Sequence, residues 1–347
     1  MARARRYLAQ RHIVTIIVRS AGIQTTVQDL GRPGWQHFGV PVGGAMDEQA
    51  HRLANLLVGN ERGAPVLDCA LGGVALQFDA PTLIALAGRD ITASLDGTPI
   101  PPWHAFRAHT GALLVLHTGC RTTIAVAGGV DVPAVLDGRG TCLRAGFGGW
   151  HGRALRRDDR LPIGTATHAA AAIEADLATR HRAVADWGIG TGLRPRYSAA
   201  PTVRMIPGPE YALLAPASRD AFLRDAFRIA PESDRMGYHL VGPPLALSSQ
   251  RDMLSSGVTA GTIQLPPGGA PIVLMADRQT TGGYPRLGDV IAVDLPLLAQ
   301  LRAGDRVGFA PVSLDVAHAL LRQREHDLSR ASLALQLRFA AGAPDAR

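Results

Sequence analysis

Two short segments of the chain combine the residue types that could do chemistry on a small anionic molecule. The first, residues 22–34, reads GIQTTVQDLGRPG, and the second, residues 276–285, reads ADRQTTGGYP. Both contain Gln-Thr-Thr with Asp and Arg nearby, and both follow an apolar run rich in β-branched residues. Backbone N–H groups, Thr hydroxyls and an Arg stabilise negative charge that develops on oxygen, and Arg also holds a carboxylate through two parallel hydrogen bonds. We therefore expect the two segments to form loops that meet in one site.

The candidate catalytic residues are side chains of these two loops: Asp29, Arg32, Asp277, Arg278, Gln279 and Thr280. We expect the two arginines to bind anionic groups, whereas the Gln and the Thr would contact an oxyanion or a ureido oxygen. One of the aspartates would orient an arginine or accept a proton. The alternative is that these Asp–Arg neighbours only hold the loops in place.

A further set of polar residues is expected to bind the substrate: Thr25, Thr26, Asp47, Asp234, Arg235, Thr281 and Tyr284. Asp47 has a second interpretation, because it also fits as the N-cap of a helix. Asp234 and Arg235 belong to a short polar turn that would either line the same cleft or hold the edge of a strand. The twelve histidines show no HxH or HExxH spacing, so no metal site is predicted.

The elements that must position these loops are mostly short β-strands, because brief apolar runs alternate with Gly, Pro and Asp-Gly turns. A helix is predicted over residues 46–58, where apolar residues recur at helical spacing between Asp47 and Gly59. The Ala-, Glu- and Arg-rich segment 168–187 predicts a second helix, and residues 314–324 predict a final amphipathic one. The fold class expected is therefore mainly β, in two parts, with a few short helices.

We divide the chain into five parts: a disordered basic leader (1–12), a first subdomain (13–165), a helical linker (166–201), a second subdomain (202–313), and a C-terminal helix and tail (314–347).

Composition excludes several kinds of chemistry. All 36 basic residues are Arg, so the chain has no Schiff-base lysine, no P-loop lysine and no biotinylated lysine. A cofactor carried on lysine, such as biotin, would therefore have to arrive on another polypeptide or domain. A nucleotide phosphate would need a site on another subunit or one built here without a P-loop.

The bulk properties indicate a cytoplasmic protein. The net charge is +7, but the arginines are scattered without interleaved aromatic residues, so we do not predict nucleic-acid binding. The longest apolar runs are far shorter than the roughly 20 residues of a membrane helix. Three cysteines without a CxxC pair suggest neither a disulfide framework nor a zinc site.

Seven motifs occur in an order that resembles a known family: TTVQDLGRPG (25–34), GGAMD (43–47), LANLLVGN (53–60), AVAGGVDVP (125–133), LRAGFGG (143–149), SDRMGY (233–238) and LMADRQTTGGYP (274–285). Together they cover roughly residues 13–313. The chain resembles the biotin-dependent carboxyltransferase family, which includes the C subunit of bacterial 5-oxoprolinase and the carboxyltransferase domain of urea carboxylase, and which is also labelled allophanate hydrolase subunit 2.

The resemblance implies two subdomains of β-barrel type, related to the cyclophilin-like fold. It also implies a part in ATP-dependent opening of 5-oxoproline to glutamate, together with A-type and B-type subunits. Two alternatives stay open. One is a carboxyltransferase that acts on urea or a related small amide with a separate biotin carrier, and the other is a regulatory protein that binds a B-type kinase inhibitor.

Two stretches depart from the family pattern. Residues 255–258 read SSGV where an acidic residue is expected, and residues 140–143 read GTCL where STDL is expected. If the carboxylates missing at Cys142 and Ser256 carry catalysis in relatives, this protein is altered or specialised. The alternative is that both positions only shape loops, since each lies beside a Gly-rich turn.

Overall fold

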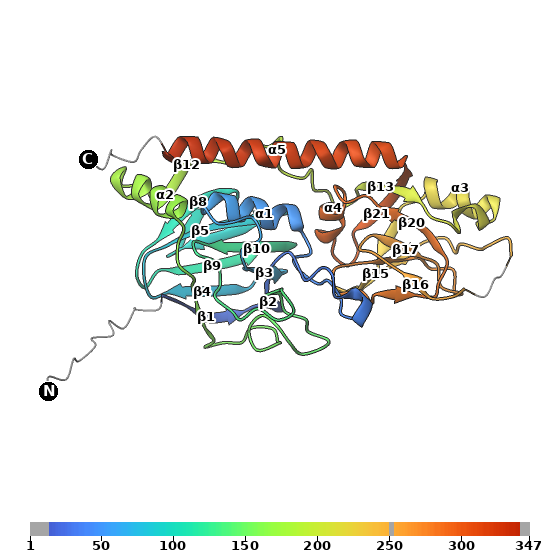
Figure 1. The fold of residues 1–347 in the computed structure, drawn as a ribbon, viewed down its shortest axis with the longest axis horizontal. Coiled ribbons are helices and arrows are strands. Elements are labelled where there is room, and N and C mark those ends of the chain that lie inside the picture. Colours follow the sequence, from blue (N-terminus) through green and yellow to red (C-terminus); the bar gives the residue numbers. More distant parts are fainter. Residues whose placement is uncertain (1–13, 250–252, 341–347) are drawn as a thin grey trace, which may run out of the picture.

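The computed structural model describes residues 14–249 and 253–340, so the expected leader lies outside the described residues. Two β-rich halves lie side by side, and helix α5 (Leu314–Ala340) runs along both of them (Figure 1). The mainly β architecture predicted from the sequence is confirmed. No helix in the two described ranges combines the length and the hydropathy that a membrane crossing requires.

The first half consists of two six-stranded antiparallel sheets. One sheet has the order β11 (Arg160–Pro162), β1 (Thr15–Ala21), β4 (Val74–Phe78), β9 (Leu113–Thr118), β6 (Thr92–Leu95) and β7 (Thr98–Ile100). The other has the order β12 (Val184–Gly188), β8 (His104–Ala108), β5 (Thr82–Gly88), β10 (Arg121–Val126), β3 (Val66–Ala70) and β2 (Gln24–Gln28). Alternate residues of each sheet, such as Leu76 and Phe106, fill a shared core between them.

Helix α1 (Glu48–Leu57) covers the outer face of the second sheet. Asp47 caps its first turn by accepting a hydrogen bond from the N–H of Ala50 at 2.9 Å. Gly59 follows the helix with φ of 71°, a left-handed conformation that glycine adopts without strain. The predicted helix and both of its boundary signals are confirmed. Because α1 packs on β5, all seven residues of that strand are buried.

The second half closes into a seven-stranded barrel. Its order is β13 (Thr202–Pro207), β20 (Arg286–Val290), β17 (Thr262–Gln264), β18 (Ile272–Leu274), β15 (Gly237–Val241), β14 (Phe227–Ile229) and β21 (Arg306–Pro311). Outside the barrel lie helices α3 (Pro216–Arg224) and α4 (Leu295–Ala299) and a small two-stranded antiparallel sheet of β16 (Ser256–Gly257) and β19 (Thr281–Gly282). Three stacked or tilted aromatic rings, those of Phe222, Phe227 and Phe309, fill one side of its core.

Two elements differ from the sequence-based expectation. Helix α2 (His168–Thr179) ends earlier than predicted, and β12 then pairs with β8 inside the first half instead of forming part of a linker. Helix α5 begins at the predicted residue but continues to Ala340, well past Arg324. Residues 325–340 contain no Gly or Pro, and Leu328 and Phe339 are buried against the first half, which explains the extension.

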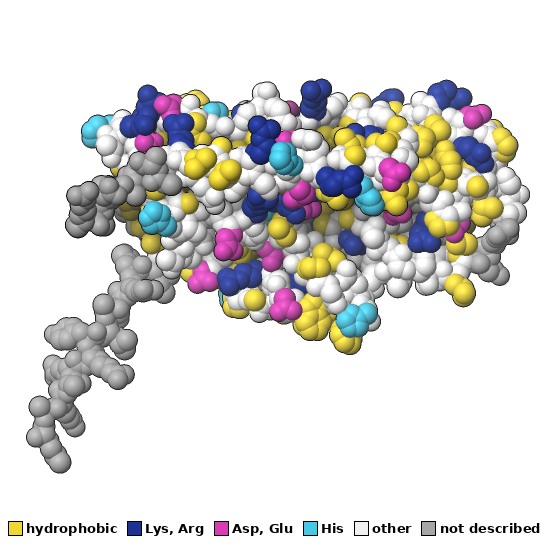
Figure 2. Space-filling model, turned by 45° about the horizontal axis from the view of Figure 1, so that its top comes forward, with side chains coloured by type: hydrophobic (Ala, Val, Ile, Leu, Met, Phe, Trp, Pro, Cys, Tyr) yellow, Lys and Arg dark blue, Asp and Glu magenta, His cyan; other side chains and the backbone are white. Residues whose placement is uncertain are grey.

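Charged side chains do not gather into a basic band on the face shown in Figure 2, where arginines are dispersed among acidic and apolar residues.

Candidate functional site

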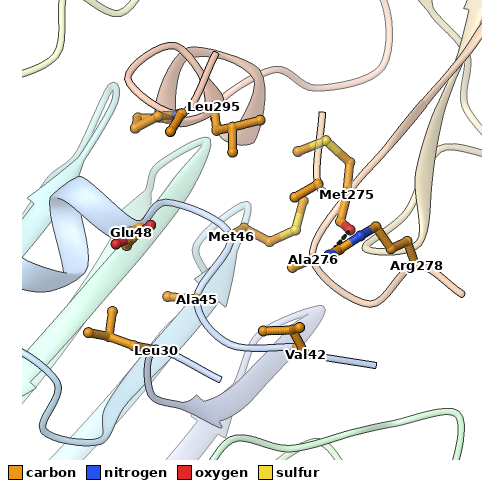
Figure 3. Close-up of a pocket in the computed structure, with 13 residues that line it drawn as sticks. Leu30, Val42, Ala45, Met46, Glu48, Met275, Ala276, Arg278 and Leu295 are labelled. Carbon is orange, nitrogen blue, oxygen red and sulfur yellow. Dashed lines mark hydrogen bonds between the residues drawn. The ribbon is translucent and has the colours of Figure 1, made fainter. Parts of the chain in front are cut away.

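A cavity of about 160 Å³ lies between the two halves, where the two predicted loops come together (Figure 3). The first half contributes the loop after β2 and the start of α1: Leu30, Val42, Gly43, Ala45, Met46 and Glu48. The second half contributes the loop after β18, the start of α4 and nearby backbone: Ala260, Met275, Ala276, Arg278, Ala292, Leu295 and Pro296. The structure thus brings both predicted loops to one interdomain pocket, which is a common place for a ligand site.

Arg278 is the cation of this pocket. It is buried, and its described hydrogen bonds are long ones, from Nε to the carbonyl of Val258 and from Nη1 to that of Met275, both at 3.4 Å. No carboxylate among residues 14–249 and 253–340 forms an ion pair with it. Burial lowers the pKa of Arg278, and the nearby charge of Asp277 opposes that shift. A buried guanidinium without a carboxylate partner is well suited to bind an anionic ligand.

Asp277 lies beside the pocket but is held by Arg235. The Arg235 guanidinium donates to both carboxylate oxygens of Asp277 at 2.8 Å and also reaches Asp68 of the first half at 3.2 Å. Arg235 further donates to the carbonyl of Gly44 at 2.6 Å. Arg235 and Asp277 are both buried, and the contacts of Arg235 with Asp68 and Gly44 join the two halves across the interface.

On the first-half side, Asp68 connects this buried network by accepting hydrogen bonds from two arginines, Arg235 and Arg121. Its other carboxylate oxygen accepts a hydrogen bond from Arg121 at 2.8 Å. Burial would raise the pKa of Asp68, but the charges of Arg121 and Arg235 outweigh it and hold the pKa below its ordinary value. Burial would likewise lower the pKa of Arg235, but Asp277 and Asp68 raise it. The structure therefore places Arg235, predicted to bind substrate, in an ionic link between the halves.

Asp47 forms a second link across the interface. Besides capping α1, it accepts hydrogen bonds from the hydroxyl of Tyr197 at 2.6 Å and from Nε2 of Gln300 at 2.7 Å. Burial raises the pKa of Asp47 despite these bonds. The hydrogen bond from the N–H of Ala50 to its carboxylate supports the capping interpretation.

Arg32 is fully buried beneath the first loop. Its Nη2 donates to the carbonyl of Gly140, and its guanidinium lies 4.9 Å from the ring centre of Phe147. Its Nη1 has no hydrogen-bond partner among the described residues. A Cβ atom added to Gly43 would lie 3.4 Å from this Nη1 and 3.7 Å from Oδ1 of Asp277. Arg32 and Asp277 thus approach each other from opposite halves without forming an ion pair.

The remaining residues of the first loop stabilise its backbone. Asp29 accepts hydrogen bonds from the N–H groups of Gly31 and Arg139, and the side chain is buried. Thr25 and Thr26 belong to strand β2, and neither lines the pocket. The Thr25 hydroxyl donates to the carbonyl of Ala21 at 2.7 Å, and that of Thr26 accepts from Gln28 at 3.0 Å.

The other predicted residues of the second half lie around the pocket rather than in it. Gln279 is exposed, Thr280 is half-buried, and Thr281 belongs to β19. Tyr284 is 45% exposed and lines a separate hollow of the barrel. Asp234 is exposed and accepts hydrogen bonds from the N–H groups of Met236 and Gly237.

Sequence reasoning missed Glu48 as a pocket residue and Asp68 as the centre of the ionic network. Glu48 follows the helix N-cap, where an acidic residue is common for structural reasons alone. Asp68 could not be recognised because Arg235, its partner from the second half, is far away in the sequence. Two positions depart from the family pattern. Cys142 is buried and forms a β-bridge with Phe147, and Ser256 of β16 pairs with Gly282 of β19 in the second loop. No cluster of three or more potential metal ligands occurs in the described part of the chain.

Comparisons with known proteins agree with this architecture. The family model described as "Carboxyltransferase domain, subdomain A and B" matches residues 38–311. The 5-oxoprolinase C subunit of Escherichia coli (strain K12) is 40% identical over 302 residues, covering 86% of this chain and 91% of that protein. The 5-oxoprolinase C subunit of Haemophilus influenzae is 35% identical over 305 residues, covering 87% of this chain and 93% of that protein.

Among solved structures, Kluyveromyces lactis urea carboxylase matches with a TM-score of 0.83 and 25% identity. The match covers 91% of this chain but 29% of that longer protein. The family match spans most of the chain, including most of the sheet pair and the barrel that enclose the pocket. The chain therefore belongs to the carboxyltransferase domain family that comprises subdomains A and B.

Proposed function

We propose that this chain is the C subunit of an ATP-dependent 5-oxoprolinase, which opens 5-oxo-L-proline to L-glutamate together with an A-type and a B-type subunit. The observation that carries the proposal is the buried guanidinium of Arg278, which forms no ion pair within residues 14–249 and 253–340 and lines a pocket of small-molecule size. The similarity to two bacterial 5-oxoprolinase C subunits over nearly their whole length supports it.

The pocket suits this chemistry. 5-Oxoproline carries a carboxylate, which a guanidinium binds with charge-assisted hydrogen bonds. Opening its lactam develops negative charge on the carbonyl oxygen, which preorganised donors stabilise. Arg278 is the donor inside the cavity, whereas Gln279 and Thr280 follow it directly and would act at the cavity rim. Asp277 is an acceptor held in one orientation by Arg235.

ATP is not assigned to a site on this chain. The sequence has no lysine, so a P-loop cannot be built from it. In the proposed complex the nucleotide phosphates are bound by a partner protein, and the role of this chain is to hold the lactam substrate. The isolated chain should therefore lack 5-oxoprolinase activity.

A second function is favoured by the match to urea carboxylase, whose fold this chain shares at a TM-score of 0.83. In that case the pocket would bind a small amide whose nitrogen receives the carboxyl group from N-carboxybiotin, with the amide proton passing to the biotin nitrogen. Without lysine, this chain would need the biotin to be delivered on a separate carrier.

Reconstitution separates the two functions. The chain would be co-expressed with A-type and B-type subunits from the same genome, and glutamate release from 5-oxo-L-proline would be measured with and without ATP. The proposal predicts ATP-dependent release that disappears when any one of the three proteins is omitted. A stable complex without turnover, combined with carboxyl transfer from an added biotinylated carrier, would favour the second function instead.

A further inference from the structure

The interdomain pocket contains two polar side chains of opposite charge and is otherwise apolar. Among its lining residues, Arg278 and Glu48 are the ones that carry nitrogen or oxygen in the side chain. Figure 3 shows Glu48 on the first-half side and Arg278 on the second-half side, with Met46 between them. A ligand that spans this pocket meets a cation at one end and a carboxylate at the other.

Glu48 retains the capacity to accept a further hydrogen bond. Its side chain is 39% exposed and forms an ion pair with Arg52 one turn later in α1. Arg52 is shared, because it also donates to Glu325 of α5 at 2.8 Å. A carboxylate has about four lone-pair positions, so the pair with Arg52 leaves Glu48 able to accept from a ligand.

We propose that Glu48 determines substrate specificity by accepting a hydrogen bond from an N–H group of the ligand, while Arg278 binds the carboxylate of the same molecule. The ligand class is a small carboxylate that carries an N–H donor on an apolar ring. The inference rests on the proposed function, in which the donor is the lactam N–H of 5-oxoproline. The side chains of Met46, Met275 and Leu295 would then contact the methylene groups of the ring.

Volume and charge are consistent with this ligand class. A cavity of about 160 Å³ admits a molecule of the size of one amino acid but not a nucleotide. A ligand with a carboxylate and no donor would leave Glu48 facing an acceptor, which costs binding free energy because the two oxygens repel. A ligand with a donor and no carboxylate would leave Arg278 buried without an anion.

The test is a comparison of three ligands by calorimetry. L-5-oxoproline has both groups, its lactone analogue replaces the ring N–H by oxygen, and pyrrolidin-2-one lacks the carboxylate. The wild-type chain should bind the lactam roughly 10- to 100-fold more tightly than the lactone, as expected for one hydrogen bond to a charged group. Glu48→Met should bring that ratio close to one, and Glu48→Gln, which keeps an acceptor oxygen, should retain part of it.

The matched control is Glu325→Met, because Glu325 pairs with the same Arg52 but lies outside the pocket. It should leave the lactam-to-lactone ratio unchanged. Arg278→Met should instead remove the preference for 5-oxoproline over pyrrolidin-2-one. An unchanged ratio in Glu48→Met, or failure of the wild-type chain to bind 5-oxo-L-proline either alone or in the complex, would overturn the inference.

The experiments distinguish an error in the role of Glu48 from an error in the proposed function. If the reconstituted complex turns over 5-oxo-L-proline and Glu48→Met leaves its KM unchanged, the role of Glu48 is wrong while the proposed function stands. If the complex shows no turnover but the chain still distinguishes lactam from lactone through Glu48, the proposed function is wrong while the pocket's specificity stands.

Discussion

Replacing Arg235 by Met tests whether the buried ionic network holds the two halves together. The substitution removes the guanidinium that binds Asp277 through two hydrogen bonds of 2.8 Å and reaches Asp68 at 3.2 Å. Met is similar in length to Arg and fills much of the same space. The main change is therefore the loss of the positive charge rather than the creation of a cavity. Asp277 would then be left buried without its cation.

The expected loss of stability in Arg235→Met is large because the ion pairs are buried. The side chains of Arg235, Asp68 and Asp277 are 5%, 2% and 9% exposed, so solvent screens the pairs very little. Removing one partner of such a buried pair costs about 3–5 kcal/mol, because the other charge stays desolvated and unpaired. Asp68 keeps Arg121 as a partner, so most of the loss arises at Asp277.

The assay is urea denaturation followed by circular dichroism. Arg235→Met should lower the free energy of unfolding by about 3–5 kcal/mol. The control is Arg180→Met at the C-cap of α2, which removes solvent-exposed ion pairs with Asp176 and Asp186 and should cost no more than about 0.5 kcal/mol. Adding Asp277→Asn to Arg235→Met should recover part of the lost unfolding free energy, because the second substitution removes the buried carboxylate that has no cation beside it.

An Arg235→Met variant as stable as the Arg180→Met control would refute a stabilising role for the buried ionic network. Such a result would mean that water reaches the interface and solvates Asp277, so that the ionic network contributes no more than a surface pair does.

Three further outcomes concern His51 in helix α1, the N-cap Asp47 of that helix, and Tyr197, which donates to Asp47. Burial lowers the pKa of His51 to about 4 from 6.5, so the unfolded chain binds the proton first and stability should fall by roughly 3 kcal/mol as the pH drops from 6.5 to 4. Urea titrations at several pH values should show this slope in the wild type and its loss in His51→Gln. Asp47→Ala should cost about 2–4 kcal/mol in the same denaturation assay, since it removes a helix cap and strands Gln300 and the hydroxyl of Tyr197. Tyr197→Phe should cost less than Asp47→Ala, because it leaves the cap in place; an equal or larger loss would contradict the assigned role of Asp47.

Local signals in the sequence predicted the elements that local interactions determine. Helix α1 was predictable because Asp47 and Gly59 terminate it and its apolar residues have a helical period. The mainly β halves were predictable from short apolar runs between turn residues. Helix α5 was predicted too short, because its second part is stabilised by long-range burial of Leu328 and Phe339 rather than by a continuous apolar stripe. Strand β12 was missed for a similar reason, since it exists through pairing with β8.

The candidate site was predicted in part. The meeting of the two loops was expected from their shared residue types, and the pocket at Arg278 agrees with it. The pairing of Arg235 with Asp68 could not be predicted, because 167 positions separate them in the sequence. The sequence does not single out Glu48 as a pocket residue, because its position in the first turn of a helix already accounts for an acidic side chain. The assignments of catalytic and substrate-binding roles to individual residues stay predictions.

The most direct test of the account is the effect of Arg278 on turnover by the complex reconstituted from all three proteins. We predict that Arg278→Met lowers kcat/KM for 5-oxo-L-proline by at least about 100-fold, as expected for loss of a charge-assisted contact to the substrate. Arg278→Lys, which keeps the charge but not the two parallel hydrogen bonds, should fall between that variant and the wild type. An Arg278→Met complex that assembles and opens 5-oxo-L-proline at the wild-type rate would contradict the claim that the interdomain pocket is the substrate site.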